Sequence, residues 1–224
     1  MNKSALIIIL LTLVLSSPGW AATRFYLPSS GAAEVSPPFD AAWDDTASAD
    51  RMRCVTRRLG TAMTDKTIDG AWVTYGICNR QYVSDPIAAQ TISGTVKGQL
   101  RGYEESTNTD AYSSIVIKVV SNDGSTVRGT LLAKTDGSNE YPTGTLTNRY
   151  TPASTAISSV VAESGDRIVI EVGWQKGWRR RMVTQSFGDN SGTDLAENET
   201  ETNANNPWIE FSQDIRFPSV SVDG

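Results

Sequence analysis

The sequence predicts an all-β protein: a single antiparallel β-sandwich, jelly-roll-like, preceded by an extended Pro-rich N-terminal arm. Three observations predict it. From residue 71 onward, apolar and β-branched side chains recur at every second position. Turn-forming residues interrupt these runs roughly every 8–12 residues. No convincing long helical repeat occurs. A chain of 224 residues is long enough to bury the core of one such domain.

The first 21 residues have the composition of a secretory signal peptide. Lys3 precedes an apolar run from Ala5 to Leu15, which is shorter than the about 20 residues of a membrane-spanning helix. Cleavage after Ala21 puts small residues at the positions that the peptidase reads. We therefore expect a secreted protein, extracellular, at the cell surface or periplasmic, with no membrane span in the mature chain. An uncleaved membrane anchor is the alternative interpretation.

Residues 22–50 form the predicted arm, and residues 51–224 form the predicted sandwich domain. The prolines of the arm are incompatible with helices and central strands. We expect an extended segment on the domain, with Phe25, Phe39 and Trp43 as anchors. Alternatively, such a segment completes the sheet of a neighbouring molecule by strand addition.

The domain itself divides into strands separated by turns. The stretch from Ala47 to Leu59 fits a helix and a strand equally well. The later runs are clearer, and the predicted strands are 72–83, 91–103, 112–120, 126–133, 156–162, 167–174, 178–187 and 208–217. Asp123-Gly124 is the strongest hairpin signal, because this pair adopts positive φ at low cost. A second turn is predicted at 136–139.

The expected export of the protein bears on the state of its two cysteines. In an oxidising compartment, Cys54 and Cys78 are expected to form a disulfide. It would close a loop of about 24 residues and stabilise the fold by about 3 kcal/mol. Two separate buried thiols are the alternative. A zinc site is not expected, because two cysteines without histidine cannot complete a tetrahedral shell.

Composition excludes several classes of function. The chain has no His, so Ser–His and Cys–His nucleophile pairs and an imidazole base are absent. With 20 Lys and Arg against 25 Asp and Glu, the net charge is −5. This charge argues against nucleic acid as a partner, because such binding needs a concentrated basic surface.

An acidic loop precedes the last strand. Its carboxylates Asp189, Asp194, Glu197 and Glu199 are of the type that binds calcium, which takes six to eight oxygen ligands. Their spacing does not match the helix-loop-helix calcium motif. A solvated loop without a metal is the alternative, so the cofactor prediction is either none or calcium.

Catalysis without histidine would need paired carboxylates, as in glycoside cleavage. The candidates are Glu104, Glu105, Glu163, Asp166, Glu171 and Glu210. Glu171 and Glu210 alternate with apolar neighbours as ordinary solvent-facing strand residues do. We therefore expect that the protein is not an enzyme.

Trp174 and Trp178 flank a short turn, so one or both rings are candidates for stacking on sugars. Packing in the core or at a sheet edge is the alternative for both residues.

Seven stretches carry a resemblance to a known family. They are Phe25–Ala33, Phe39–Thr46, Arg80–Ser84, Ile92–Gln99, Val120–Gly124, Gly165–Gly173 and Asn206–Ser212. Here the chain resembles uncharacterised β-sandwich proteins of bacteriophage, prophage and environmental bacterial sequences. The resemblance implies a jelly-roll-like, non-enzymatic structural or tail-appendage role and supplies no site residues. The signal peptide departs from it, because a virion protein assembled in the cytoplasm needs none.

Together these features predict a secreted, non-catalytic structural or adhesive β-sandwich of a surface or extracellular assembly, such as a filament or appendage. Its expected partners are further copies of itself or other surface proteins. The first alternative is a carbohydrate-binding module that holds polysaccharide through Trp174, Trp178 and the acidic loop, with or without calcium. The second is a phage tail-appendage protein.

Overall fold

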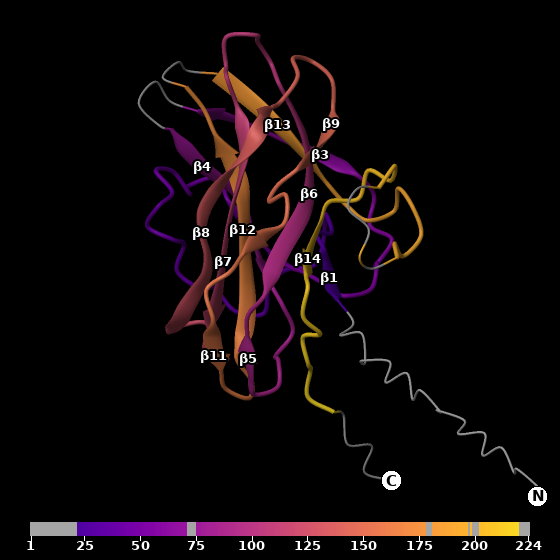
Figure 1. Ribbon diagram of the computed structural model, residues 1–224. Coiled ribbons are helices and arrows are strands. Elements are labelled where there is room, and N and C mark those ends of the chain that lie inside the picture. Colours follow the sequence, from indigo (N-terminus) through magenta and orange to yellow (C-terminus); the bar gives the residue numbers. More distant parts are fainter. Residues whose placement is uncertain (1–21, 71–74, 178–180, 197, 199–201, 220–224) are drawn as a thin grey trace, which may run out of the picture.

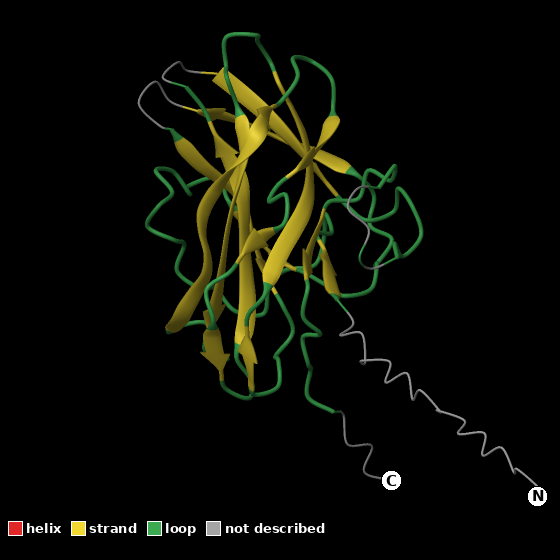
Figure 2. Ribbon diagram, viewed as in Figure 1, coloured by secondary structure: helices red, strands yellow, loops and turns green. Residues whose placement is uncertain are grey.

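The computed structural model describes residues 22–70, 75–177, 181–196, 198 and 202–219. These residues contain fourteen strands and no helix (Figures 1 and 2). The strands form two large sheets and a small one, and the two large sheets enclose the main core. The predicted all-β sandwich is therefore confirmed. None of the described residues forms a helix that could cross a membrane.

The larger sheet has seven strands. Five of them follow the order β1-β14-β6-β13-β3, and β9 and β10 pair with the edge of β6 opposite the one that pairs with β14. Its strands are β1 (Thr23–Tyr26), β3 (Thr64–Gly70), β6 (Thr95–Glu104), β9 (Thr147–Tyr150), β10 (Thr155–Ala156), β13 (Arg181–Phe187) and β14 (Trp208–Phe211). All their pairings are antiparallel.

The smaller sheet has five strands in the order β2-β4-β12-β7-β8. Its strands are β2 (Asp50–Arg53), β4 (Gly76–Val83), β7 (Tyr112–Val120), β8 (Val127–Glu140) and β12 (Arg167–Gln175). Only β2 is parallel to its neighbour within this sheet. A two-stranded sheet of β5 (Gln90–Ile92) and β11 (Val160–Ala162) lies at one end of the sandwich (Figure 1).

The main core lies between the two large sheets. In β12, Ile168, Ile170 and Val172 point into it, and in β7 the same alternation brings in Ile115 and Ile117. Residues at every second position of a strand share one side of the sheet. The period of two in the sequence therefore identifies the inward side of these strands correctly.

Turn chemistry explains two of the boundaries. Gly124 has φ +76°, and β7 and β8 pair on either side of it, so the predicted hairpin is confirmed. Gly94 has φ +98° and interrupts the predicted strand 91–103 between β5 and β6. The second predicted turn, 136–139, is wrong. β8 continues to Glu140, because this segment stays paired with β7 through irregular register.

The predicted arm packs on its own sandwich. β1 pairs with β14, and Phe25 is buried in the main core. Residues 33–49 then cross the outer side of the five-stranded sheet, where Trp43 packs against Cys78 and Val116. Within the ambiguous segment from Ala47 to Leu59, residues 50–53 form strand β2.

The expected disulfide is wrong, because Cys54 and Cys78 are both free and buried. Cys54 belongs to the same apolar cluster as Ile115, whereas Cys78 contacts the cluster of Val116. These consecutive residues of β7 point to opposite sides of the sheet, and so do the two thiols. Arg53 pairs with Val83 in a parallel register, which places Cys54 about six residues from Cys78 along β4. That is roughly 20 Å at about 3.3 Å per residue, whereas a disulfide needs Cα atoms within about 7 Å.

Candidate binding surface

Glu171 is buried on the outer side of the five-stranded sheet, so the expectation that it faces solvent is wrong. Lys118 Nζ lies 2.7 Å from its carboxylate. Trp43 Nε1 donates a hydrogen bond of 2.7 Å to the carboxylate, and the backbone N–H of Asp40 and Gln81 Nε2 donate two more, each of 3.0 Å. Asp40 and Trp43 come from the predicted arm, which covers this side of the sheet. The carboxylate is 0% exposed and is held by these four donors.

Glu210 is buried on the outer side of the seven-stranded sheet, which also contradicts the expected exposure. Arg24 Nη2 lies 2.7 Å and Lys97 Nζ 3.1 Å from its carboxylate. Asn198 donates a backbone hydrogen bond to it from the acidic loop. The guanidinium of Arg24 stacks on the Trp208 ring, with 4.2 Å from the central carbon to the ring centroid. This glutamate is likewise a structural ion-pair partner.

The other candidate carboxylates lie apart from these two. Glu163 and Asp166 both pair with Arg128, and Glu105 is exposed at the end of β6. Glu104 points inward, where its carboxylate accepts hydrogen bonds from the Ala111 N–H and the Thr143 hydroxyl. Burial raises the pKa of Glu104, and the charge of Glu140 raises it further.

The acidic loop uses two of its predicted calcium ligands for internal contacts. The carboxylate of Asp189 is buried and accepts hydrogen bonds from the N–H groups of Leu59 and Thr61 and from the Thr61 hydroxyl. Asp194 accepts the backbone N–H of Arg58 at 3.0 Å.

The other two predicted ligands, Glu197 and Glu199, lie outside the described residues. Within the described part of the chain, no three acidic, cysteine or histidine side chains are grouped closely enough to hold a metal ion. The calcium site therefore stays a prediction.

Trp174 cannot stack on a sugar, because its side chain is 0% exposed and packs in an inner cluster with Ile77 and Val183. The expectation of an exposed Trp174 is wrong, since residues 167–175 form a strand that is buried on both sides. Trp178 lies outside the described residues, so its role stays a prediction.

One part of the seven-stranded sheet presents its outer side to solvent. The described residues of the acidic loop contact β14 and the neighbouring part of β6. We call this surface the Tyr103 surface; it comprises the half-buried Arg101 and Tyr103 and the exposed Asp65, Thr67, Asp69, Glu105 and Met182.

Strand register brings these side chains together. Thr184 of β13 pairs with Thr67 on one side and with Tyr103 on the other, and Met182 pairs with Asp69. Residues paired across antiparallel strands point to the same side of the sheet. The two threonine hydroxyls are 2.6 Å apart. The result is a surface with one aromatic ring among hydroxyl and carboxylate groups.

Charges surround the ring. The Tyr103 hydroxyl donates a hydrogen bond of 3.2 Å to the Glu105 carboxylate, and Arg101 donates one of 3.2 Å to Asn148. Burial lowers the pKa of Arg101, and the negative charge of Asp65 opposes that shift. Met182 is 43% exposed and adds the main apolar contact area.

Sequence reasoning missed the Tyr103 surface. The signal that points to it is weak: the polar positions Lys97, Gln99 and Arg101 alternate with apolar ones, and the same parity continues to Tyr103. This pattern places Tyr103 on the polar side of β6. It does not bring β3 and β13 beside it, because strand order depends on the tertiary fold.

Comparisons with known proteins add little to this geometry. No protein-family model and no curated protein matches the chain. Among solved structures, a CocE/NonD family hydrolase from Staphylococcus aureus is similar with a TM-score of 0.49 and 8% identity, over 89% of this chain and 37% of that one.

An α-amino acid ester hydrolase gives a TM-score of 0.45 at 9% identity, over 87% and 36% of the two chains. The VP2 subviral particle of infectious bursal disease virus gives 0.26 at 12% identity, over 70% and 42%. The chain spans just over a third of the length of both hydrolases. At these TM-scores, the likenesses carry no argument about activity.

Proposed function

We propose that the protein is a secreted, non-catalytic β-sandwich that acts as an adhesive or structural unit of a surface assembly. The single observation that carries this proposal is the Tyr103 surface, which is polar and mostly exposed on the outer side of the seven-stranded sheet. An aromatic ring and a methionine supply contact area there, and the surrounding hydroxyl and carboxylate groups supply hydrogen bonds.

The arrangement of the glutamates supports a non-catalytic role. Glu171 and Glu210 are each held by cations and further donors on opposite sheets. Glycoside cleavage needs two carboxyl groups facing one substrate. Neither glutamate meets that requirement, since each is buried under its own covering segment.

The test is binding by a variant with the Tyr103 surface altered. Purified processed protein is analysed by sedimentation for self-association and by retention on envelopes of the producing cells. We expect the double variant Tyr103→Ser, Met182→Thr to lose at least tenfold in apparent affinity. The control is Val161→Thr, because Val161 is 70% exposed in β11 at the opposite end of the sandwich.

Failure of the wild-type protein both to self-associate and to bind envelopes would contradict the adhesive role. Equal binding by the double variant and the control would contradict the assignment to the Tyr103 surface. Retention on isolated polysaccharide that the double variant loses would identify carbohydrate as the adhesive target.

A further inference from the structure

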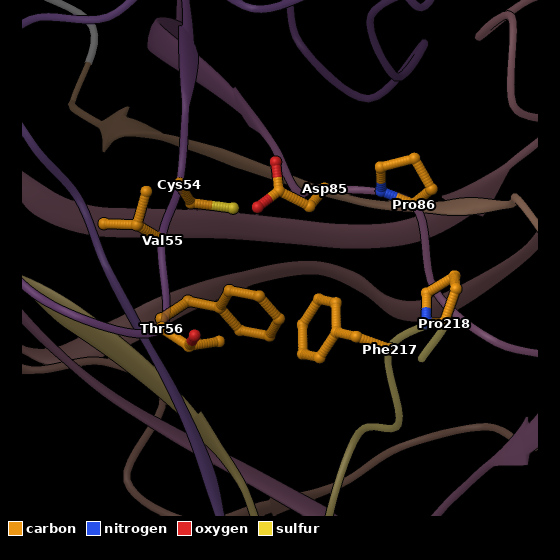
Figure 3. Close-up of a pocket in the computed structure, with 8 residues that line it drawn as sticks. Cys54, Val55, Thr56, Asp85, Pro86, Phe217 and Pro218 are labelled. Atoms are coloured by element: carbon orange, nitrogen blue, oxygen red, sulfur yellow. The ribbon is translucent and has the colours of Figure 1, made fainter. Parts of the chain in front are cut away.

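A pocket opens where edge strands of the two large sheets meet. Tyr26 of β1 and Val55, which closely follows β2, exchange backbone hydrogen bonds of 2.8 and 3.3 Å and join the two edges. Beside this junction lies a cavity of about 360 Å³. Its lining residues are Phe25, Cys54, Val55, Thr56, Asp85, Pro86, Phe217 and Pro218 (Figure 3).

The walls of this pocket are mostly apolar. Phe25 and Phe217 meet edge-on, with ring centroids 6.4 Å apart. Figure 3 shows the rings of Pro86 and Pro218 on the side of the pocket away from Cys54. Pockets of about 300–1,000 Å³ with apolar walls and few polar groups are typical sites for small molecules. Here the volume corresponds to a ligand at the small end of that range.

One carboxylate gives the pocket its polarity. Asp85 accepts two hydrogen bonds from Arg53, of 2.9 and 2.8 Å, and its carboxylate points toward the pocket (Figure 3). Each carboxylate oxygen has two lone pairs, so both retain capacity for another donor. Asp85 and Glu34 together place two negative charges around Arg53 and raise its pKa. The site therefore favours a hydrogen-bond donor over an anion.

Two further features narrow the ligand class. Burial raises the pKa of the Cys54 thiol well above its ordinary value, so the thiol is a poor nucleophile. Cys54 therefore only lines the pocket. Pro86 and Pro218 have no N–H, so these positions cannot donate backbone hydrogen bonds to an incoming peptide strand. Both features favour a small, non-covalent ligand.

We propose that this pocket binds a small phenol. The ring packs against Phe217 and the two prolines, and the phenolic hydroxyl donates a hydrogen bond to the Asp85 carboxylate. This site is separate from the Tyr103 surface and does not depend on the function proposed for that surface.

The experiment compares two ligands of nearly equal shape, p-cresol and toluene, by titration of the full processed protein followed by NMR. We expect saturable shifts at Phe25 and Cys54, and p-cresol binding at least tenfold more tightly than toluene, because a bond to a charged acceptor is strong. Asp85→Ala should remove this preference and leave toluene binding unchanged. Phe217→Ala should weaken both ligands at least fivefold.

The matched control is Asp50→Ala. Asp50 is exposed, does not line the pocket, and pairs with Lys66 at a distance of 2.7 Å. It should retain the preference for p-cresol. The proposal is overturned by equal affinity for the two ligands, by a preference that survives in Asp85→Ala, or by shifts that do not saturate. Tighter binding of the tripeptide Ala-Tyr-Ala than of p-cresol would assign the pocket to a protein partner instead.

Discussion

Glu171 and Glu210 lie on the outer sides of opposite sheets, and the two sites are built differently. Glu171 has one cation, Lys118, and three neutral donors. Glu210 has two cations, Arg24 and Lys97, and one backbone donor. The first carboxylate is balanced by a single charge. The second is paired with two positive charges among the described residues.

The difference concerns what holds each covering segment in place. At Glu171, two of the donors come from residues 40–43, so the carboxylate ties the N-terminal arm to the five-stranded sheet. At Glu210, both cations come from strands of the sheet itself, and the described part of the acidic loop adds the Asn198 N–H. The arm is thus part of its ion-pair site, whereas the loop mainly covers a site that the sheet already forms.

The largest effect is expected for Lys118→Met. It leaves the buried Glu171 without its cation, and breaking a buried pair in this way costs about 3–5 kcal/mol. Urea denaturation measures the loss. In the control Glu163→Gln, the change removes an ion pair between Arg128 and a carboxylate that is 68% exposed, at 2.7 Å, and that loss should stay below about 1 kcal/mol. Equal losses in the two variants would show that Glu171 does not depend on Lys118.

The contribution of the arm is measured by Trp43→Phe. This change keeps an aromatic ring and removes the Nε1 donor that lies 2.7 Å from Glu171. A hydrogen bond to a charged group contributes about 1.5–3 kcal/mol, so we expect a loss of about 2 kcal/mol and faster proteolysis within residues 33–49. An unchanged unfolding midpoint would mean that the arm is held by apolar packing alone.

On the other sheet, Lys97→Met should cost only about 1 kcal/mol. Arg24 remains 2.7 Å from Glu210 and keeps the carboxylate paired. Guanidinium denaturation is unsuitable because its salt screens charges, so the measurement is again made in urea. A loss as large as that of Lys118→Met would contradict the contrast between the two sites.

The smallest effect concerns Glu104, a buried carboxylate that faces Glu140. Because the fold raises the pKa of Glu104 above its ordinary value of 4.5, the folded protein binds more protons than the unfolded chain just above that pH. Its stability therefore falls as pH rises through the folded pKa.

Glu104→Gln removes this loss, and the amide can donate to Glu140. We expect the variant to be up to about 1 kcal/mol more stable at pH 7 and to lose that advantage near pH 4. Thermal denaturation at the two pH values is the measurement. A variant that is less stable at pH 7 would show that the ionised carboxylate is favourable there.

Much of the fold was predictable from local pattern. The period of two identified the inward side of β7 and β12. The Asp123-Gly124 turn correctly located the hairpin between β7 and β8. The candidate site was not predictable to the same degree. Tyr103 acquires its neighbours from β3 and β13, and strand order across a sheet leaves little trace in a single sequence.

The cysteines and tryptophans show why pattern was insufficient elsewhere. Cys54 and Cys78 are close in sequence, yet they lie on opposite sides of one sheet. Trp174 follows an alternating run and is buried, because the strand that contains it is covered on both sides.

The sequence by itself determined which residues of a strand share a side, where the sharpest turn lies and that the chain is all-β. Those properties depend on the backbone geometry of neighbouring residues. Only the tertiary structure decided which outer sides are covered. It thereby made Glu171 and Glu210 buried ion-pair partners and left Tyr103 on an exposed surface. Burial depends on segments far apart in the chain, such as the arm over β12, and alternation along one strand carries no information about them.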